Sequence, residues 1–220
     1  MSTKKKVTAH KNETTSIIFA CIVMSRILFF DTETTGLPKA RAQSALIRAD
    51  NWPDLVSISW SVYEDKELVE KQTYIIKPTG WTIPDESIKF HGITNEMANQ
   101  KGSDLTVVLT IFKKALEGCT SVIAHNMEFD RNVVFNGFKW RLGLDPTTFW
   151  SYAAETCTMQ KAKAEMKVLG KGFHPGDPYK FIGLDELYTD TFKRPPPPAA
   201  HTADRDVDVL QQIWFTRWAK

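Results

Sequence analysis

The chain has 220 residues, a formal net charge of +2, 42% hydrophobic and 25% charged residues, and three cysteines. This length suits one sizeable α/β domain, with two small domains as the alternative, and the near-neutral charge excludes a strongly cationic coat for nucleic acid. The cysteines, at positions 21, 119 and 157, are too few and too scattered for a disulfide framework or a zinc site, and they favour a reducing compartment.

The first 24 residues are interpreted as an N-terminal tail, which leaves residues 25–220 for the domain. Three lysines at 4–6 precede an apolar run at 16–24, a pattern that resembles a secretory signal. We favour an intracellular protein instead, because no small-residue cleavage site precedes the first strand with room to spare. The run is also shorter than the ~20 residues that span a bilayer. Whether the tail is ordered is left open.

The first third of the chain favours strands. The apolar segment RILFFD at 26–31 is typical of a buried strand, and a loop is predicted over 32–53. Residues 55–64 alternate between apolar and polar, so they predict a half-buried strand. Residues 68–78 are expected to pair back onto it as a hairpin, with the turn in the segment EDKE.

Helical patterns follow. An irregular segment with short helical turns is predicted over 79–102, and Ser103 is expected to cap a helix that stops at Gly118. A short buried strand is predicted at 121–126. An amphipathic helix is expected to begin at Phe129, because its apolar residues recur at helical spacing.

The remaining chain is a mixed stretch over 145–192, with a helix predicted at 184–192. The prolines of 194–198 form a stiff extended segment, either a spacer before the last helix or a ligand for a polyproline-binding domain. Hairpin strands followed by strand–helix alternation predict an α/β fold, with a mixed central β-sheet flanked by α-helices.

Asp31 and Glu33 stand two residues apart behind the first apolar run. Residues i and i+2 of a strand point to one face, so both carboxylates project side by side if the strand extends that far. Two like charges at this separation raise a pKa unless a cation holds both ionised, and hard oxygen ligands suit Mg²⁺ or Mn²⁺. A solvated acidic pair at a strand end is the alternative.

Asp130 falls near the start of a predicted helix, where the helix dipole favours an anion. The preceding strand at 121–124 ends beside it, which places Asp130 at the edge of the sheet where ligand sites of α/β proteins gather. A plain acidic residue in the first helical turn is the alternative.

The segment HTADRDVDV at 201–209 holds three alternating aspartates. Asp206 lies on the apolar side of the last helix and can reach inward, whereas Asp204 and Asp208 are interpreted as solvated charges. Five residues turn a helix by about 500°, so His201 cannot share a helix face with Asp206. We expect His201 on the preceding loop, free to swing toward a site that Asp206 anchors.

Together these clusters resemble the DEDDh 3′–5′ exonucleases, the proofreading-subunit-like and ribonuclease T-like enzymes on a ribonuclease H-like fold. The segments DTETTGLP at 31–38, HNMEFD at 125–130 and HTADRD at 201–206 follow the family's order. The segments HGIT at 91–94 and DLVSISW at 54–60 are also similar to family segments. Each motif is weak alone, and the ordered set, which covers roughly residues 26–219, is specific.

The resemblance implies four ligands for two divalent cations, Mg²⁺ or Mn²⁺: Asp31, Glu33, Asp130 and Asp206. It implies that His201 is the general base and that Leu37 lies under the 3′-terminal base. The implied substrate-binding residues are Thr34, Thr35, Leu37 and Asn126. The chain departs from the family at Met127 and Glu128, where small residues are frequent, and at 154–158, where Asp-Thr is common. These departures put local substrate contacts in doubt.

The implied activity is hydrolysis of phosphodiester bonds from a 3′ end, which releases nucleoside 5′-monophosphates by a two-metal mechanism. We favour single-stranded DNA or the 3′ ends of duplex DNA, because the last motif and its proline run resemble DNA-degrading members. An exoribonuclease of the same family is the first alternative. A non-catalytic nucleic-acid-binding module on the same fold is the second. No membrane association is expected, and protein partners, oligomeric state and physiological role stay open.

Overall fold

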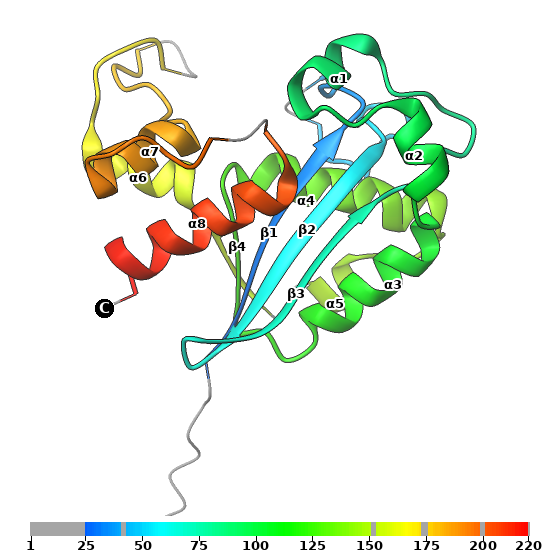
Figure 1. Ribbon diagram of the computed structural model, residues 1–220, viewed down its shortest axis with the longest axis horizontal. Coiled ribbons are helices and arrows are strands. Elements are labelled where there is room, and N and C mark those ends of the chain that lie inside the picture. The colour runs from blue at the N-terminus through cyan, green and yellow to red at the C-terminus, as the bar shows by residue number, and fades with distance from the viewer. Residues whose placement is uncertain (1–24, 41–42, 151–152, 173–175, 199–200, 220) are drawn as a thin grey trace, which may run out of the picture.

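The computed structural model describes residues 25–40, 43–150, 153–172, 176–198 and 201–219 (Figure 1). The predicted N-terminal tail lies outside these ranges. The strands are β1 (Arg26–Thr34), β2 (Leu55–Glu64), β3 (Glu67–Ile75), β4 (Ser121–Ala124) and β5 (Ala154–Cys157). They form one sheet in the order β3-β2-β1-β4-β5, in which β1 runs antiparallel to β2 and parallel to β4. The predicted mixed central sheet is therefore confirmed.

The predicted hairpin is also confirmed. β2 and β3 are antiparallel, and the two residues between them, Asp65 and Lys66, have φ angles of 48° and 74°. Positive φ at both central positions defines a type I′ turn, whose twist matches that of the flanking strands.

β1 is longer than the predicted strand at 26–31. Its ladder with β2 continues from the pair Arg26–Glu64 to the pair Thr34–Leu55. The prediction that a loop begins at residue 32 is therefore wrong, because pairing with a strand distant in sequence extends β1 through the polar residues.

The helices are α1 (Asp85–His91), α2 (Asn95–Lys101), α3 (Leu105–Leu116), α4 (Met127–Asn136), α5 (Thr147–Trp150), α6 (Thr158–Met166), α7 (Leu184–Phe192) and α8 (Ala203–Arg217). A π-helical turn, η1 (Gly137–Arg141), continues α4. The two helical turns expected within 79–102 are α1 and α2, and α7 has the predicted bounds. Among the described residues, no helix is long and apolar enough to cross a membrane.

Two predicted helix starts are wrong. The N-cap of α3 is Asp104 rather than Ser103, because the Asp104 carboxylate accepts hydrogen bonds from the first-turn amides at 2.8 and 3.2 Å. Ser103 instead forms a bridge with the segment that follows β3. α4 begins at Met127, two residues before the predicted start, because the left-handed Asn126, with φ 81°, turns the chain directly from β4 into the helix.

Helices cover both faces of the sheet (Figure 1). On one face, Leu28 and Phe30 of β1 pack in the large core with α3 and α4. On the other, Phe29 packs with Val207 and Leu210 of α8. A separate core joins α6 and α7 to Val209 and Ile213 of α8. The alternation along β1 thus decides which face each of its side chains meets.

Candidate functional site

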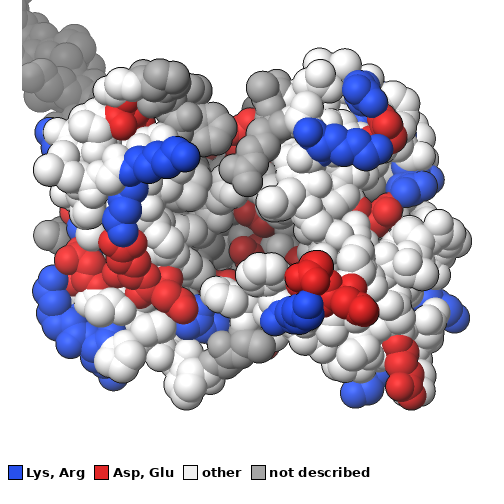
Figure 2. Space-filling model, turned by 90° about the horizontal axis from the view of Figure 1, so that it is seen from above, with Lys and Arg blue, Asp and Glu red and all other residues white. Residues whose placement is uncertain are grey.

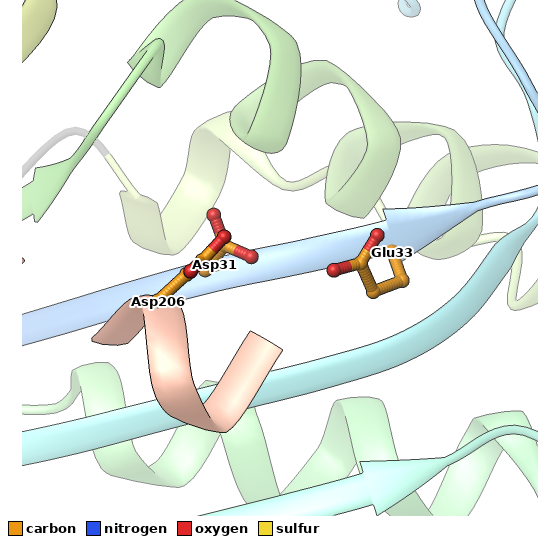
Figure 3. A group of neighbouring side chains, drawn as sticks. All are labelled: Asp31, Glu33 and Asp206. Carbon is orange, nitrogen blue, oxygen red and sulfur yellow. The ribbon is translucent and has the colours of Figure 1, made fainter. Parts of the chain in front are cut away.

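Three acidic side chains meet between β1 and α8. Asp31 and Glu33 lie on the same face of β1 as Phe29, which packs against α8. Asp206, in the first turn of α8, projects toward them (Figure 3). One carboxylate oxygen from each of these three residues lies within 4.8 Å of the others. The predicted side-by-side arrangement of the first two carboxylates is therefore present, and the last acidic cluster supplies a third.

Small side chains of β2 make room for these carboxylates. In the ladder, Asp31 is opposite Ser59 and Glu33 is opposite Ser57, and residues opposite one another share a face of the sheet. Both serine hydroxyls donate to backbone carbonyls of β3, at 3.0 and 3.1 Å. The hydroxyl groups of both serines therefore have hydrogen-bond partners within the sheet. Their small side chains leave space for the acidic group beneath the start of α8.

Asp130 of α4 is held next to this group. Its side chain is buried, and its Oδ1 accepts hydrogen bonds from the Thr32 amide at 3.1 Å and from Thr32 Oγ1 at 2.7 Å. Thr32 lies between Asp31 and Glu33 on β1, and the Asp130 charge raises the pKa of both. Asp130 is not one of the three residues within 4.8 Å, but its position and charge belong to the same cluster.

Burial is the first cause of a raised pKa at every carboxyl of the cluster. Repulsion from other cluster carboxylates adds to it at Asp31, Glu33 and Asp130, whereas Arg205 opposes it at Asp206. The pKa of Glu33 rises to about 8 and that of Asp130 to about 7, and those of Asp31 and Asp206 rise as well. Such a cluster retains protons near neutral pH unless a cation compensates its charge. Converging carboxylate oxygens are the ligands that Mg²⁺ and Mn²⁺ take, so this donor set fits divalent cations.

Two basic residues adjoin Asp206. Arg205, whose side chain is only 10% exposed, donates through Nη1 to Asp206 Oδ1 at 2.7 Å. His201 lies on the loop before α8, as predicted, with its side chain 63% exposed and Nδ1 3.7 Å from Asp206 Oδ2. The interpretation of the other two aspartates also agrees with the structure, since Asp204 is exposed and Asp208 pairs with a lysine of β3 at 2.6 Å.

A cavity of about 780 Å³ is lined by residues that follow β1 and β4. Leu37, which is 67% exposed, and Asn126 line it, together with the aromatic rings of Trp52, Phe129 and Phe181. Viewed from the edge at which β1 ends, the surface is hollowed between two parts of the molecule, and acidic side chains are visible inside the hollow (Figure 2). Two of the four residues predicted to contact substrate are thus cavity residues.

Thr34 and Thr35 are not among the described residues that line this cavity. Thr34 Oγ1 donates to the carbonyl of Gly36 at 2.7 Å. Thr35 exchanges two hydrogen bonds of 3.0 Å with the backbone of Asp54, one through its amide and one through its hydroxyl. Both side chains therefore stabilise the turn after β1. We expect any substrate contact at these two residues to involve their backbone atoms.

His125, part of the second motif, joins elements instead of facing the carboxylates. Nδ1 is 2.9 Å from Thr158 Oγ1 at the start of α6, and Nε2 is 3.0 Å from the carbonyl of Ile182 before α7. Burial lowers the pKa of His125 to about 4, so the ring is neutral. Thr158 is the last residue of the departing segment 154–158, and its hydroxyl serves this structural contact.

Sequence reasoning missed the nearly buried Arg205. A basic residue between two aspartates on a helix is ordinarily a surface charge, and the spacing Asp-Arg-Asp at 204–206 was the available signal. The structure shows that this arginine turns inward and shares the carboxylate of Asp206.

Comparison with known proteins yields a family and a fold. Residues 28–170 match the model of the exonuclease family. No curated protein matches the chain. Similar solved structures include exonuclease I without ligand, with a TM-score of 0.63 and 20% identity over 86% of this chain. E. coli exonuclease I in complex with a dT13 oligonucleotide has a TM-score of 0.66 and 20% identity over 89% of this chain.

The chain covers 41% and 42% of those two proteins, so it spans about two fifths of their length. At 20% identity the likeness shows the fold, a mixed five-stranded sheet flanked by helices of the ribonuclease H-like kind. The predicted fold class is confirmed.

Proposed function

Because the chain belongs to the exonuclease family, as a DEDDh-type member of the ribonuclease H-like superfamily, we propose that it hydrolyses nucleic acid from the 3′ end. The observation that carries this proposal is the convergence of Asp31, Glu33 and Asp206 within 4.8 Å of one another. One buried and three half-buried carboxylates that lie close together are unfavourable in a scaffold that only binds nucleic acid, and they suit a site that gains cations. The proposed exonuclease domain comprises residues 25–220.

Two divalent cations, Mg²⁺ or Mn²⁺, would be held by the four carboxylates of the cluster, Asp31, Glu33, Asp130 and Asp206. When bound, they supply Lewis-acid stabilisation of the attacking and leaving oxygens in an in-line displacement. The chain itself supplies the fixed positions of the ligands, since β1, α4 and α8 are locked together by packing and by the contacts of Thr32. One related structure is described as a zinc ion bound form of the E. coli exonuclease I complex with single-stranded DNA, which supports the proposal that this chain also binds metal.

His201 is the proposed general base. Its imidazole is 63% exposed and lies 3.7 Å from Asp206 Oδ2, at the rim of the acidic group. A histidine in this position can accept a proton from the attacking water and pass it to solvent.

Single-stranded DNA is the proposed substrate, with the 3′ ends of duplex DNA included. Solved structures of E. coli exonuclease I hold dT13 and dA16 oligonucleotides, which supports this class. In the cavity, Leu37 and Phe129 offer apolar contact to the terminal base, and Asn126 offers an amide. An intracellular location belongs to the same proposal, and the free thiols of Cys119 and Cys157 agree with it.

The test is a degradation assay with 5′-labelled single-stranded DNA, duplex DNA and RNA, in the presence of Mg²⁺, Mn²⁺ or a chelator. We expect single-stranded DNA to shorten from its 3′ end, to release nucleoside 5′-monophosphates, and to stay intact with the chelator. Faster cleavage of RNA would assign an exoribonuclease instead. Metal-independent binding without any product would assign the non-catalytic module.

Single substitutions test which residues are needed for cleavage. Asp31→Ala and Asp206→Ala should abolish cleavage, whereas Asp204→Ala, an exposed aspartate in the same helical turn, should retain it. His201→Ala should bind Mn²⁺ as the wild type does but turn over more slowly, by roughly 10²–10⁴-fold. An active Asp206→Ala protein beside an inactive Asp204→Ala protein would show that the wrong aspartate has been chosen.

A further inference from the structure

Arg205 makes more contacts than a surface arginine needs. It lies in the first turn of α8, and its side chain is only 10% exposed. Nη1 donates to Asp206 Oδ1 at 2.7 Å and to Asp185 Oδ1 at 2.5 Å, and Nη2 donates to the Pro197 carbonyl at 3.2 Å. Removing a guanidinium from water is unfavourable unless its donors are well used, so this burial calls for a role.

These contacts connect three separate segments at the acidic site. Asp185 belongs to the first turn of α7. Pro197 belongs to the proline run, four residues before His201. A guanidinium presents its donors in a rigid planar fork, so one side chain can fix the directions of several acceptors at once. Arg205 therefore connects the start of α7 and Pro197 to Asp206.

The contact to Asp206 is compatible with a shared cation. Arg205 engages Oδ1, while Oδ2 is the oxygen recorded 3.7 Å from His201. With this pairing in place, Asp206 still offers an oxygen within 4.8 Å of oxygens on Asp31 and Glu33. The contact of Arg205 with the carboxylate thus coexists with the convergence of Asp206 on Asp31 and Glu33.

We propose that Arg205 is a positioning residue, which fixes Asp206 for binding a divalent cation with Asp31 and Glu33. The proposal rests on the proposed function for the identity of the cation and of the reaction. The positive charge of Arg205 opposes a nearby dication, but Asp185 already offsets that charge at 2.5 Å. The orienting effect is therefore the larger one. Outer partners of metal ligands are typically worth 10–100-fold in affinity or activity.

Arg217 provides a matched control on the same helix. Its side chain is 16% exposed and it also bridges two carboxylates, Glu165 on α6 at 2.9 Å and Asp190 on α7 at 2.6 Å. Within the described ranges, none of its hydrogen bonds or ion pairs reaches the acidic site. Arg217→Ala thus removes a comparable clamp between α8 and α7 but leaves Asp206 oriented.

The experiment compares the wild type with Arg205→Ala, Arg205→Lys and Arg217→Ala. Mn²⁺ binding is titrated by electron paramagnetic resonance without nucleic acid, kcat and KM are measured on single-stranded DNA, and melting temperatures are recorded. We expect Arg205→Ala to weaken Mn²⁺ binding and to lower kcat, each by roughly 10–100-fold, with a smaller change in KM. Arg205→Lys should fall between, because a compact ammonium keeps the charge but lacks the rigid planar fork that fixes the directions of the three acceptors. Arg217→Ala should lower only the melting temperature.

Wild-type Mn²⁺ affinity and kcat in both Arg205 variants, or equal losses in Arg217→Ala, would overturn the proposal. If Arg205→Ala does not fold, the proposal is tested with Arg205→Lys alone. Wild-type Mn²⁺ affinity and kcat in Arg205→Lys would then refute the role of the planar guanidinium. The Mn²⁺ titration does not depend on nuclease activity. If the wild type does not cleave nucleic acid but Arg205→Ala still weakens Mn²⁺ binding, only the proposed reaction would be contradicted. A wild type that binds no Mn²⁺ would overturn both.

Discussion

Glu33 holds its proton to an unusually high pH. Burial, followed by the charges of Asp206 and Asp130, raises its pKa to about 8 from an ordinary 4.5. Between these values the folded protein binds a proton that the unfolded chain releases, so the free energy of unfolding falls as the pH rises through this window. His125 changes the free energy of unfolding in the opposite direction, because burial lowers its pKa to about 4 from 6.5. The free energy of unfolding therefore rises with pH between these values, and this contribution is complete by about pH 6.5.

We therefore predict that, in a chelator, the melting temperature of the wild type falls between pH 6.5 and 8.5. Glu33→Gln should show a shallower fall and should be the more stable protein at pH 8.5, because the buried charge is absent. Added Mg²⁺ should stabilise the wild type more at pH 8.5 than at pH 6.5, since the cation favours the ionised form. Scanning calorimetry measures all three effects. Parallel curves for the two proteins would contradict the assigned titration of Glu33.

The spacing of residues predicted which side chains gather, but not how they are held. The i, i+2 pattern of a strand places Asp31 and Glu33 on one face, and the apolar stripe of the last helix points Asp206 inward. The hydrogen bonds of Thr32 to Asp130 and the fork of Arg205 depend on how β1, α4 and α8 approach one another. Local periodicity contains no information on that approach, so these contacts could not be predicted.

The turn between β2 and β3 is strained by its own residues. Asp65 and Lys66 both have left-handed backbone, where an L side chain costs about 1–2 kcal/mol relative to glycine. At Asp65 this conformational cost is partly offset, because its carboxylate accepts a hydrogen bond from the amide of Ser25 at 3.0 Å. Within the described residues, the side chain of Lys66 makes no comparable contact.

Lys66→Gly should therefore raise the free energy of unfolding by about 0.5–1 kcal/mol. This range is the backbone strain removed, less the extra freedom that glycine gives the unfolded chain. The urea midpoint measures the change, and nuclease activity should stay at the wild-type level because the turn lies at the opposite end of β2 from the acidic site. A lower midpoint would show that the turn is not strained at this residue.

Elements with strong local signals were predicted, and those that depend on distant pairing were not. The helix at 184–192 was predicted with its observed bounds, because its apolar period and flanking glycine are local. β5 was not recognised within the mixed stretch, since it has four partly or fully exposed residues and is held by parallel pairing with β4. The extension of β1 to Thr34 depends in the same way on β2.

The molecule as a whole attracts a polyanion only weakly. Its net charge is +2, and Arg131 and Lys163 are the only basic residues among the described ones that line the cavity. Each is already paired, Arg131 with Glu155 at 2.7 Å and Lys163 with Asp177. Affinity for nucleic acid should therefore depend more on base contacts and cations than on a basic surface.

Oligonucleotide binding should accordingly respond weakly to salt. Two phosphate contacts predict a slope of log affinity against log salt of roughly −1.4, at about −0.7 for each contact with single strands. Fluorescence anisotropy with the slow His201→Ala variant, at fixed Mg²⁺ and varied KCl, measures the slope. A value steeper than about −3 would reveal a basic track outside the cavity.

β1 is the central strand of the five, flanked by β2 and β3 on one side and by β4 and β5 on the other. Fluctuations of a folded protein open its outer strands and loops long before its centre, so backbone amides around Asp31 and Glu33 should exchange with deuterium among the last. Breathing motions at the periphery would then leave the relative positions of Asp31 and Glu33 intact. Asp31 and Glu33 are thus held by the part of the chain that should open most slowly.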